Sequence, residues 1–166
     1  MLDQKKNIIL IIIFFIILLS IISALIIEHA LGHQPCSLCL YERIPYFLSA
    51  LLIIKIFFFK KYEKITLLIL FLIFMIGALL AFYHFGIEQG FFNESFVCNV
   101  ESQLKILSKE NLLKELNKNI VSCKDVTFRI LGLSLAGMNT ILSVVLSIIF
   151  LKLFFNYGSS STSQYK

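Results

Sequence analysis

The sequence predicts an all-α fold, an integral membrane four-helix bundle. Of the 166 residues, 58% are hydrophobic and only 15% are charged, and the mean hydropathy is +0.89. A water-soluble domain is about half apolar and about a quarter charged, so lipid must surround much of this chain. The apolar runs are continuous, whereas the strands of a membrane barrel would alternate apolar and polar residues. The length suits a single membrane domain covering residues 1–166.

Four apolar segments are long enough to cross the membrane, which takes about 20 helical residues. They cover residues 8–27, 40–59, 65–85 and 130–155. Lys5 and Lys6 before the first segment resemble the start of a signal peptide. Its apolar core is too long for one and no small-residue cleavage pattern follows, so we expect a retained helix. Residues 28–39 and 86–129 then form outer loops, and the serine-rich tail 156–166 is predicted to be disordered.

The basic residues predict the orientation of the chain. Lys5 and Lys6 precede the first segment, and Lys60, Lys61 and Lys64 join the second to the third. Cytoplasmic loops carry an excess of Lys and Arg. We therefore expect both termini in the cytoplasm and the two longer loops outside, which in a bacterium is the periplasm. The basic residues form no patch interleaved with aromatic residues, so we expect no nucleic-acid partner.

Within the second outer loop, leucine and isoleucine recur at helical spacing among Lys, Glu and Asn. These positions are Leu104, Leu107, Leu112, Leu116 and Ile120. The pattern predicts a short amphipathic helix on the membrane surface. An ordinary solvated loop is the alternative.

The four cysteines all fall on the predicted outer side. Cys36 and Cys39 form a Cys-x-x-Cys motif at the start of the second span, and Cys98 and Cys123 bracket the second loop. An even number of cysteines in an oxidising compartment favours disulfides. A four-cysteine zinc site usually combines two tight motifs, which Cys98 and Cys123 do not provide, so we expect no metal. Purely structural disulfides are an alternative, although a Cys-x-x-Cys bridge closes too small a loop to stabilise much.

The surroundings of the Cys-x-x-Cys motif favour redox chemistry. If the motif is helical, Cys36, Cys39 and Arg43 lie at i, i+3 and i+7 on one face. The helix N-terminus would then stabilise a thiolate at Cys39 or Cys36. Arg43 would lie at the depth of a quinone headgroup, where a guanidinium could stabilise charge on a reduced oxygen. The alternative for Arg43 is an ion pair with Glu42 or lipid phosphate, and Pro45 leaves open whether the helix kinks or begins there.

These motifs resemble a known family. Residues 35–43, Pro-Cys-Ser-Leu-Cys-Leu-Tyr-Glu-Arg, resemble the signature of the disulfide bond formation protein B family, quinone-linked oxidases of the bacterial periplasm. Residues 83–89, Tyr-His-Phe-Gly-Ile-Glu-Gln, and residues 128–139, Phe-Arg-Ile-Leu-Gly-Leu-Ser-Leu-Ala-Gly-Met-Asn, resemble that family's third-span exit and fourth-span entry. The resemblance covers nearly the whole chain. Two departures are the absence of tryptophan and of a proline at residues 93–97, before Cys98.

The resemblance implies a quinone-dependent oxidoreductase in the bacterial inner membrane. Its partners would be a soluble thioredoxin-fold, DsbA-like oxidase and the membrane quinone pool, with ubiquinone or menaquinone as cofactor. The implied redox disulfides are Cys36–Cys39 and Cys98–Cys123. Cys98 would form the mixed disulfide with the partner, Cys123 would attack Cys36, and Cys39 would be the thiolate beside the quinone with Arg43. Because such a partner is itself a strong oxidant, about −120 mV, its reoxidation needs a still more positive electron sink.

Two polar residues outside the cysteine motif are further candidates, and one rival family and one non-enzymatic function are alternatives. His84, at the outer end of the third span, is a candidate for protonating reduced quinone; the alternative is a hydrogen bond at the helix end. Asn139 is expected to hydrogen-bond between helices. The vitamin K epoxide reductase-like family is also quinone-linked, but its quinone-side Cys-x-x-Cys lies late in the chain. A non-catalytic membrane scaffold held by disulfides is the rival outside the enzymes.

Overall fold

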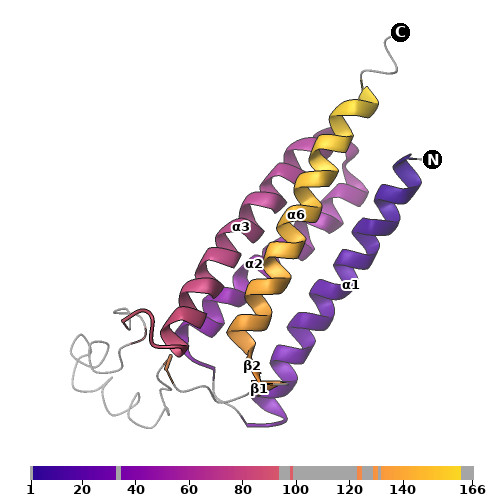
Figure 1. The fold of residues 1–166 in the computed structure, drawn as a ribbon. Helices are drawn as coiled ribbons and strands as arrows, with labels where there is room; N and C mark the ends of the chain where they lie inside the picture. The colour runs from indigo at the N-terminus through magenta and orange to yellow at the C-terminus, as the bar shows by residue number, and fades with distance from the viewer. Residues whose placement is uncertain are drawn as a thin grey trace, which may run out of the picture.

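The computed structural model describes residues 2–32, 35–93, 98, 123–124, 129–130 and 132–161. Within these residues, four long helices run side by side (Figure 1). They are α1 Leu2–His29, α2 Ser37–Phe58, α3 Glu63–Glu88 and α6 Leu135–Ser161. Each of the four contains a segment long and apolar enough to cross a membrane. The predicted all-α membrane bundle is thereby confirmed, whereas the amphipathic helix predicted at residues 104–120 lies outside the described residues.

Short elements connect and start the helices. A 3-10 turn, Lys60–Tyr62, joins α2 to α3, and β1 Arg129–Ile130 pairs antiparallel with β2 Leu133–Ser134. Gly132 in the turn between the strands has φ +83°, which glycine adopts without strain.

The fourth helix differs in extent from the sequence-based expectation. It begins at Leu135 rather than at residue 130, because the preceding backbone pairs in the hairpin and the Ser134 hydroxyl caps the helix, accepting from the Gly137 N–H at 3.2 Å. At the other end it continues to Ser161, past residue 156, where the tail was expected to begin. Each residue added to an existing helix contributes a backbone hydrogen bond. The helix α6 can therefore continue beyond the end of the apolar segment.

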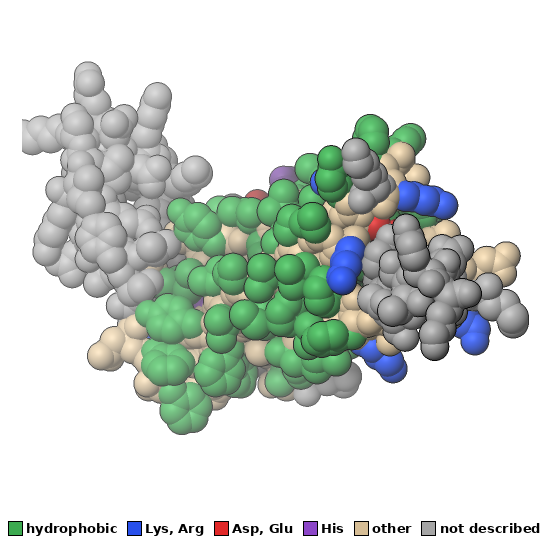
Figure 2. All heavy atoms as spheres, turned by 90° about the horizontal axis from the view of Figure 1, so that it is seen from above, with side chains coloured by type: hydrophobic (Ala, Val, Ile, Leu, Met, Phe, Trp, Pro, Cys, Tyr) green, Lys and Arg blue, Asp and Glu red, His purple; other side chains and the backbone are tan. Residues whose placement is uncertain are grey.

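One face of each helix forms the core, and the other faces lipid. In α1, Leu10, Ile13, Ile17 and Ile21 recur at three- and four-residue spacing and are buried, as helical periodicity requires. They belong to one cluster with residues of the other three helices, including Ile53, Leu70, Phe74, Leu146 and Phe150. The large apolar side chains between them are exposed, and Figure 2 shows such side chains covering much of the visible face. This surface suits hydrocarbon.

Small residues let the helices approach closely near the site described below. A Cβ on Gly77 of α3 would lie 3.3 Å from Pro45 Cγ of α2. A Cβ on Gly137 of α6 would lie 3.2 Å from the Phe85 ring of α3. Close packing through small residues is how membrane helices associate when lipid removes the hydrophobic driving force. Pro45 lies inside α2 rather than at its start, so the helix continues through it.

The two ends of the bundle differ. Both termini lie at one end, and the α1–α2 connection and the hairpin lie at the other (Figure 1). The end of the bundle with the termini carries the exposed residues Lys5, Lys60 and Lys64. Lys5 lies near the start of α1, and the other two lie where α2 is joined to α3. There Lys6 Nζ also forms an ion pair with the buried Glu63 Oε1 at 2.7 Å, which ties the start of α1 to the start of α3.

Substitution of Phe74 tests the core. Phe74 is fully buried, with its ring 5.5 Å from that of Tyr46 and 5.6 Å from that of Phe150. Phe74→Ala should lower the free energy of unfolding by about 3–5 kcal/mol, because the cavity removes packing contacts between three helices. Reversible unfolding in mixed detergent measures the change. Phe82→Ala on the same helix is the control, since Phe82 is 55% exposed, and an equal loss in that variant would contradict the assignment of the core.

Candidate active site

The Cys-x-x-Cys motif forms the start of α2. Cys36 is the N-cap residue, with extended backbone angles of φ −69° and ψ 166°. Its Sγ accepts a hydrogen bond from the backbone N–H of Cys39 at 3.2 Å. A serine or aspartate oxygen usually occupies this position in soluble helices. Here a sulfur atom lies at the positive end of the helix dipole, which favours the thiolate.

All four cysteines meet at the end of the bundle opposite the termini. Cys98 and Cys123 form a disulfide with Cα atoms 5.4 Å apart, as the resemblance implied. Cys36 and Cys39 are free thiols rather than the implied disulfide, and their Sγ atoms lie within 4.8 Å of each other. Cys36, Cys98 and Cys123 are buried in a single apolar cluster, against which Cys39 packs. The disulfide and the dithiol are therefore neighbours.

The pKa of the Cys36 thiol is lowered from its ordinary value. The main cause is the hydrogen bond from the Cys39 side chain, and the Cys39 backbone N–H adds to it. Burial and the negative charges of Glu42 and Glu88 act in the opposite direction without reversing the shift. The sequence did not decide which of Cys39 and Cys36 carries the thiolate. The hydrogen bonds from Cys39 favour the thiolate at Cys36.

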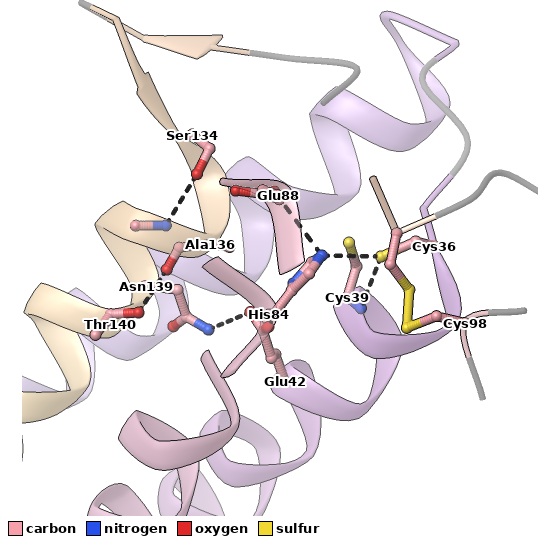
Figure 3. Close-up of polar contacts among 12 residues, drawn as sticks. Cys36, Cys39, Glu42, His84, Glu88, Cys98, Ser134, Ala136, Asn139 and Thr140 are labelled. Atoms are coloured by element: carbon pink, nitrogen blue, oxygen red, sulfur yellow. Dashed lines mark hydrogen bonds and ion pairs between the residues drawn. A yellow bond between two sulfur atoms is a disulfide. The ribbon is translucent and has the colours of Figure 1, made fainter. Parts of the chain in front are cut away.

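His84 of α3 lies against the dithiol. Its Nε2 is 3.5 Å from Cys36 Sγ, and its Nδ1 is 2.7 Å from Glu42 Oε1 (Figure 3). Glu88, one helical turn further along α3, has Oε1 3.8 Å from the same Nε2. The imidazole is only 2% exposed. A buried histidine between a thiol and a carboxylate can accept a proton from the thiol while the carboxylate stabilises the resulting imidazolium.

The carboxylate of Glu42 joins three helices. While Oε1 contacts His84 of α3, Oε2 accepts a hydrogen bond from Asn139 Nδ2 of α6 at 2.6 Å. The Asn139 side-chain oxygen in turn accepts from the Tyr46 hydroxyl of α2, which also contacts Ser143 Oγ at 3.3 Å. Asn139 thus bonds between helices as expected. The ion pair with Glu42 that was the alternative for Arg43 does not form, because Glu42 is buried and faces α3 and α6.

Arg43 faces the first helix instead. Its Nη1 donates to Glu28 Oε2 of α1 at 2.5 Å, and the two side chains are 19% and 24% exposed. Adjacent helical residues point about 100° apart, so Arg43 and Glu42 contact different neighbours. Arg43 follows Cys39 by about one turn of α2, and Cys39 is less buried than Cys36. A spacing of four residues puts Arg43 on the same side of α2 as Cys39, the more exposed of the two sulfurs.

The chain also matches a known protein family over most of its length. The model of the family "Disulfide bond formation protein DsbB" matches residues 6–153. The chain belongs to the DsbB family. Among curated proteins, the uncharacterized protein RP370 of Rickettsia prowazekii (strain Madrid E) is similar to this chain, 29% identical over 146 residues, 86% of this chain and 83% of the relative. No solved structure matches this DsbB-family chain. DsbB membership makes it a multi-pass membrane protein of disulfide bond formation and implies a disulfide-generating oxidoreductase.

Sequence reasoning missed several polar residues around the DsbB cysteines. Glu88 lies one turn after His84. This i, i+4 spacing is a signal from which the contact between the two side chains could have been predicted. No local pattern pointed to Glu28 as the partner of Arg43, or to Tyr46 as the partner of Asn139. These contacts join different helices, so only the packing of the DsbB bundle brings them together.

The hydrogen bond from the Cys39 side chain predicts the titration of Cys36. Cys39→Ala removes the main cause of the lowered pKa, so the Cys36 thiolate should form at higher pH and be less populated at neutral pH. Thiolate absorbance in the ultraviolet measures this in a protein that also carries Cys98→Ser and Cys123→Ser. Ser37→Ala is the control, and its midpoint should match that of the parent. An unchanged midpoint in Cys39→Ala would contradict the assigned cause.

Proposed function

We propose that this protein is a quinone-dependent disulfide oxidase of the bacterial inner membrane. It would reoxidise a soluble periplasmic thioredoxin-fold, DsbA-like thiol oxidase and pass the electrons to membrane quinone. The observation that carries the proposal is the packing of the Cys98–Cys123 disulfide in one buried cluster with Cys36, next to Cys39. Two cysteine pairs in contact, one in a loop and one at the start of a membrane helix, form a route for electrons into the bilayer.

The first exchange takes place at the loop disulfide. A thiolate of the reduced partner attacks Cys98 Sγ, the bond to Cys123 breaks, and a mixed disulfide forms. The second partner thiol then attacks the partner's own sulfur and releases Cys98. The partner leaves as a disulfide, and Cys98 and Cys123 hold the two electrons and two protons as thiols. Each step is a thiolate displacement of the kind that thiol–disulfide exchange follows.

The second exchange transfers these electrons to the membrane pair. Cys123 attacks Cys36 of an oxidised Cys36–Cys39 pair, and Cys39 leaves as a thiolate. Cys98 then attacks Cys123, which restores the loop disulfide and releases Cys36. A sulfur with a lower pKa leaves faster, so the lowered pKa of Cys36 supports this release. A loop disulfide with Cys36 and Cys39 as free thiols is the combination that this step would leave, and it supports the proposed order of exchange.

The residues around Cys39 fit a quinone headgroup. Arg43, partly exposed and about one turn from Cys39, would hydrogen-bond a quinone oxygen, and its ion pair with Glu28 would orient the guanidinium. Bound ubiquinone or menaquinone would supply the sink for two electrons and two protons when Cys36 and Cys39 reoxidise. His84, with Nε2 next to Cys36 Sγ, would accept a thiol proton, and Glu42 would stabilise the imidazolium.

The charge distribution supports an orientation with both termini in the cytoplasm. Exposed lysines, among them Lys5, Lys60 and Lys64, belong to the end of the bundle where the termini lie. Lys and Arg are enriched on the cytoplasmic side of membrane proteins. The cysteine cluster at the other end would then face the periplasm, where a soluble thiol oxidase can reach it.

Replacement of Cys39 tests the proposed activity. Purified protein would be mixed with a reduced thioredoxin-fold oxidase and ubiquinone, and quinone reduction followed by absorbance. Cys39→Ser should abolish turnover, because Cys36 can no longer form a disulfide with its neighbour. Ser37→Ala, inside the same motif, should retain turnover. Turnover that survives Cys39→Ser would falsify the scheme, and cysteines that stay oxidised in cells with or without quinone would indicate a scaffold instead.

Replacement of Arg43 tests the quinone contact separately. Arg43→Gln should lower quinone reduction by about tenfold or more, because a charged donor at the site of developing negative charge is lost. The first round of partner oxidation, measured without quinone, should be unchanged because it needs only the Cys98–Cys123 disulfide. Lys64→Gln removes a positive charge at the other end of the bundle and serves as the control. Equal losses in both variants would argue against a local role of Arg43.

A further inference from the structure

Three atoms that bind soft metal ions converge at the start of α2. They are Cys36 Sγ, Cys39 Sγ and a ring nitrogen of His84, all within 4.8 Å of one another. Tetrahedral zinc, with Zn–S about 2.3 Å and Zn–N about 2.0–2.1 Å, places sulfur and nitrogen ligands about 3.6 Å apart and two sulfurs about 3.8 Å apart. The observed distance from Cys36 Sγ to His84 Nε2 is 3.5 Å. This pair already has the spacing of metal ligands, and Cys39 needs only a small adjustment.

The histidine is oriented as metal-binding histidines are. Glu42 Oε1 lies 2.7 Å from Nδ1, so Nδ1–H donates to the carboxylate and the Nε2 lone pair is directed toward Cys36. Asn139 holds the other carboxylate oxygen at 2.6 Å, which fixes Glu42 in turn. A carboxylate behind a ligating histidine sets its tautomer and increases its basicity, and it is the usual outer partner in zinc sites.

The charge and burial of the cluster also suit a divalent cation. Two thiolates would neutralise the two positive charges of the ion, so the occupied site would carry no net charge from these three ligands. Cys36 is 6% exposed and His84 is 2% exposed, which excludes most competing water. Glu88 Oε1, 3.8 Å from His84 Nε2, lies close enough to approach as a fourth ligand, or a water molecule could complete the tetrahedron.

We propose that the reduced Cys36–Cys39 dithiol and His84 form a redox-gated site for a thiophilic divalent cation of the zinc class. Binding forms two metal–sulfur bonds and one metal–nitrogen bond, releases the remaining thiol protons, and moves no electrons. Oxidation of the pair to a disulfide removes both thiolate ligands, so only the reduced state binds. A bound cation also withholds both sulfurs from reoxidation. The site differs from a four-cysteine zinc site, because Cys98 and Cys123 take no part in it.

Metal titration of the full-length protein tests the proposal without any quinone. The protein would carry Cys98→Ser and Cys123→Ser, so that the only thiols are those of the site. Co²⁺ should bind with one equivalent and give thiolate charge-transfer and tetrahedral d–d absorption, and Zn²⁺ should displace it. After oxidation of the Cys36–Cys39 pair, neither signal should appear. Zn²⁺ affinity is measured by competition with a chromophoric chelator.

Variants separate the three-ligand site from a simple dithiol. Glu42→Gln should weaken Zn²⁺ binding by about 10–100-fold, the usual effect of losing the outer partner of a ligating histidine, and His84→Ala should weaken it at least as much. His29→Ala is the matched control, because His29 is exposed and bonds only to the Leu25 carbonyl among its described hydrogen bonds. Parental affinity and an unchanged cobalt spectrum in His84→Ala would overturn the proposal, as would binding that persists after oxidation.

One measurement does not depend on how the variants fold. X-ray absorption at the zinc edge of the loaded parent protein should give two sulfur ligands and imidazole scattering. A spectrum without imidazole would overturn the assignment of His84. The proposal needs the reduced thiols and His84 but no quinone, so a failed quinone assay leaves these results unaffected, and the two ideas can fail independently.

Discussion

The carboxylate of Glu42 connects the parts of the molecule on which the site depends. A carboxylate buried at the edge of the bilayer is costly unless both oxygens are satisfied, and here His84 contacts one oxygen while Asn139 donates to the other. These two contacts tie α2 to α3 and α6 at the same level as the cysteines. They also fix the imidazole against Cys36 Sγ. The hydrogen bonds that hold the site together are therefore also the ones that align the three helices.

The two sulfurs of the Cys-x-x-Cys motif have different surroundings, although they lie on the same helix start. Cys36 is buried against the loop disulfide and His84, where hydrogen bonds from Cys39 stabilise its thiolate. Cys39 is less buried and lies about one turn before Arg43, which faces α1. Cys36 thus lies against the disulfide, while Cys39 packs against the same cluster as the more exposed sulfur of the two.

The fold was largely predictable because lipid imposes a simple rule. Backbone groups in hydrocarbon must be satisfied within the segment, so each long apolar run becomes a helix. The rule says little about where helices end, since polar residues at the interface can continue a helix or leave it. For this reason α6 starts after a hairpin and extends to Ser161, beyond the apolar segment from which it was predicted.

The sequence by itself determined the membrane class, the four spans, the cysteine motif and the family, because these depend on composition and on residues close together in the chain. It did not determine the partners of the charged residues. Glu42 and Arg43 are adjacent, and an ion pair between them was one alternative that the sequence left open. The helix rotates them by about 100°, so that Glu42 meets His84 and Asn139, and Arg43 meets Glu28. Only the packing of α1, α3 and α6 around α2 decided these contacts, since each joins residues far apart in sequence.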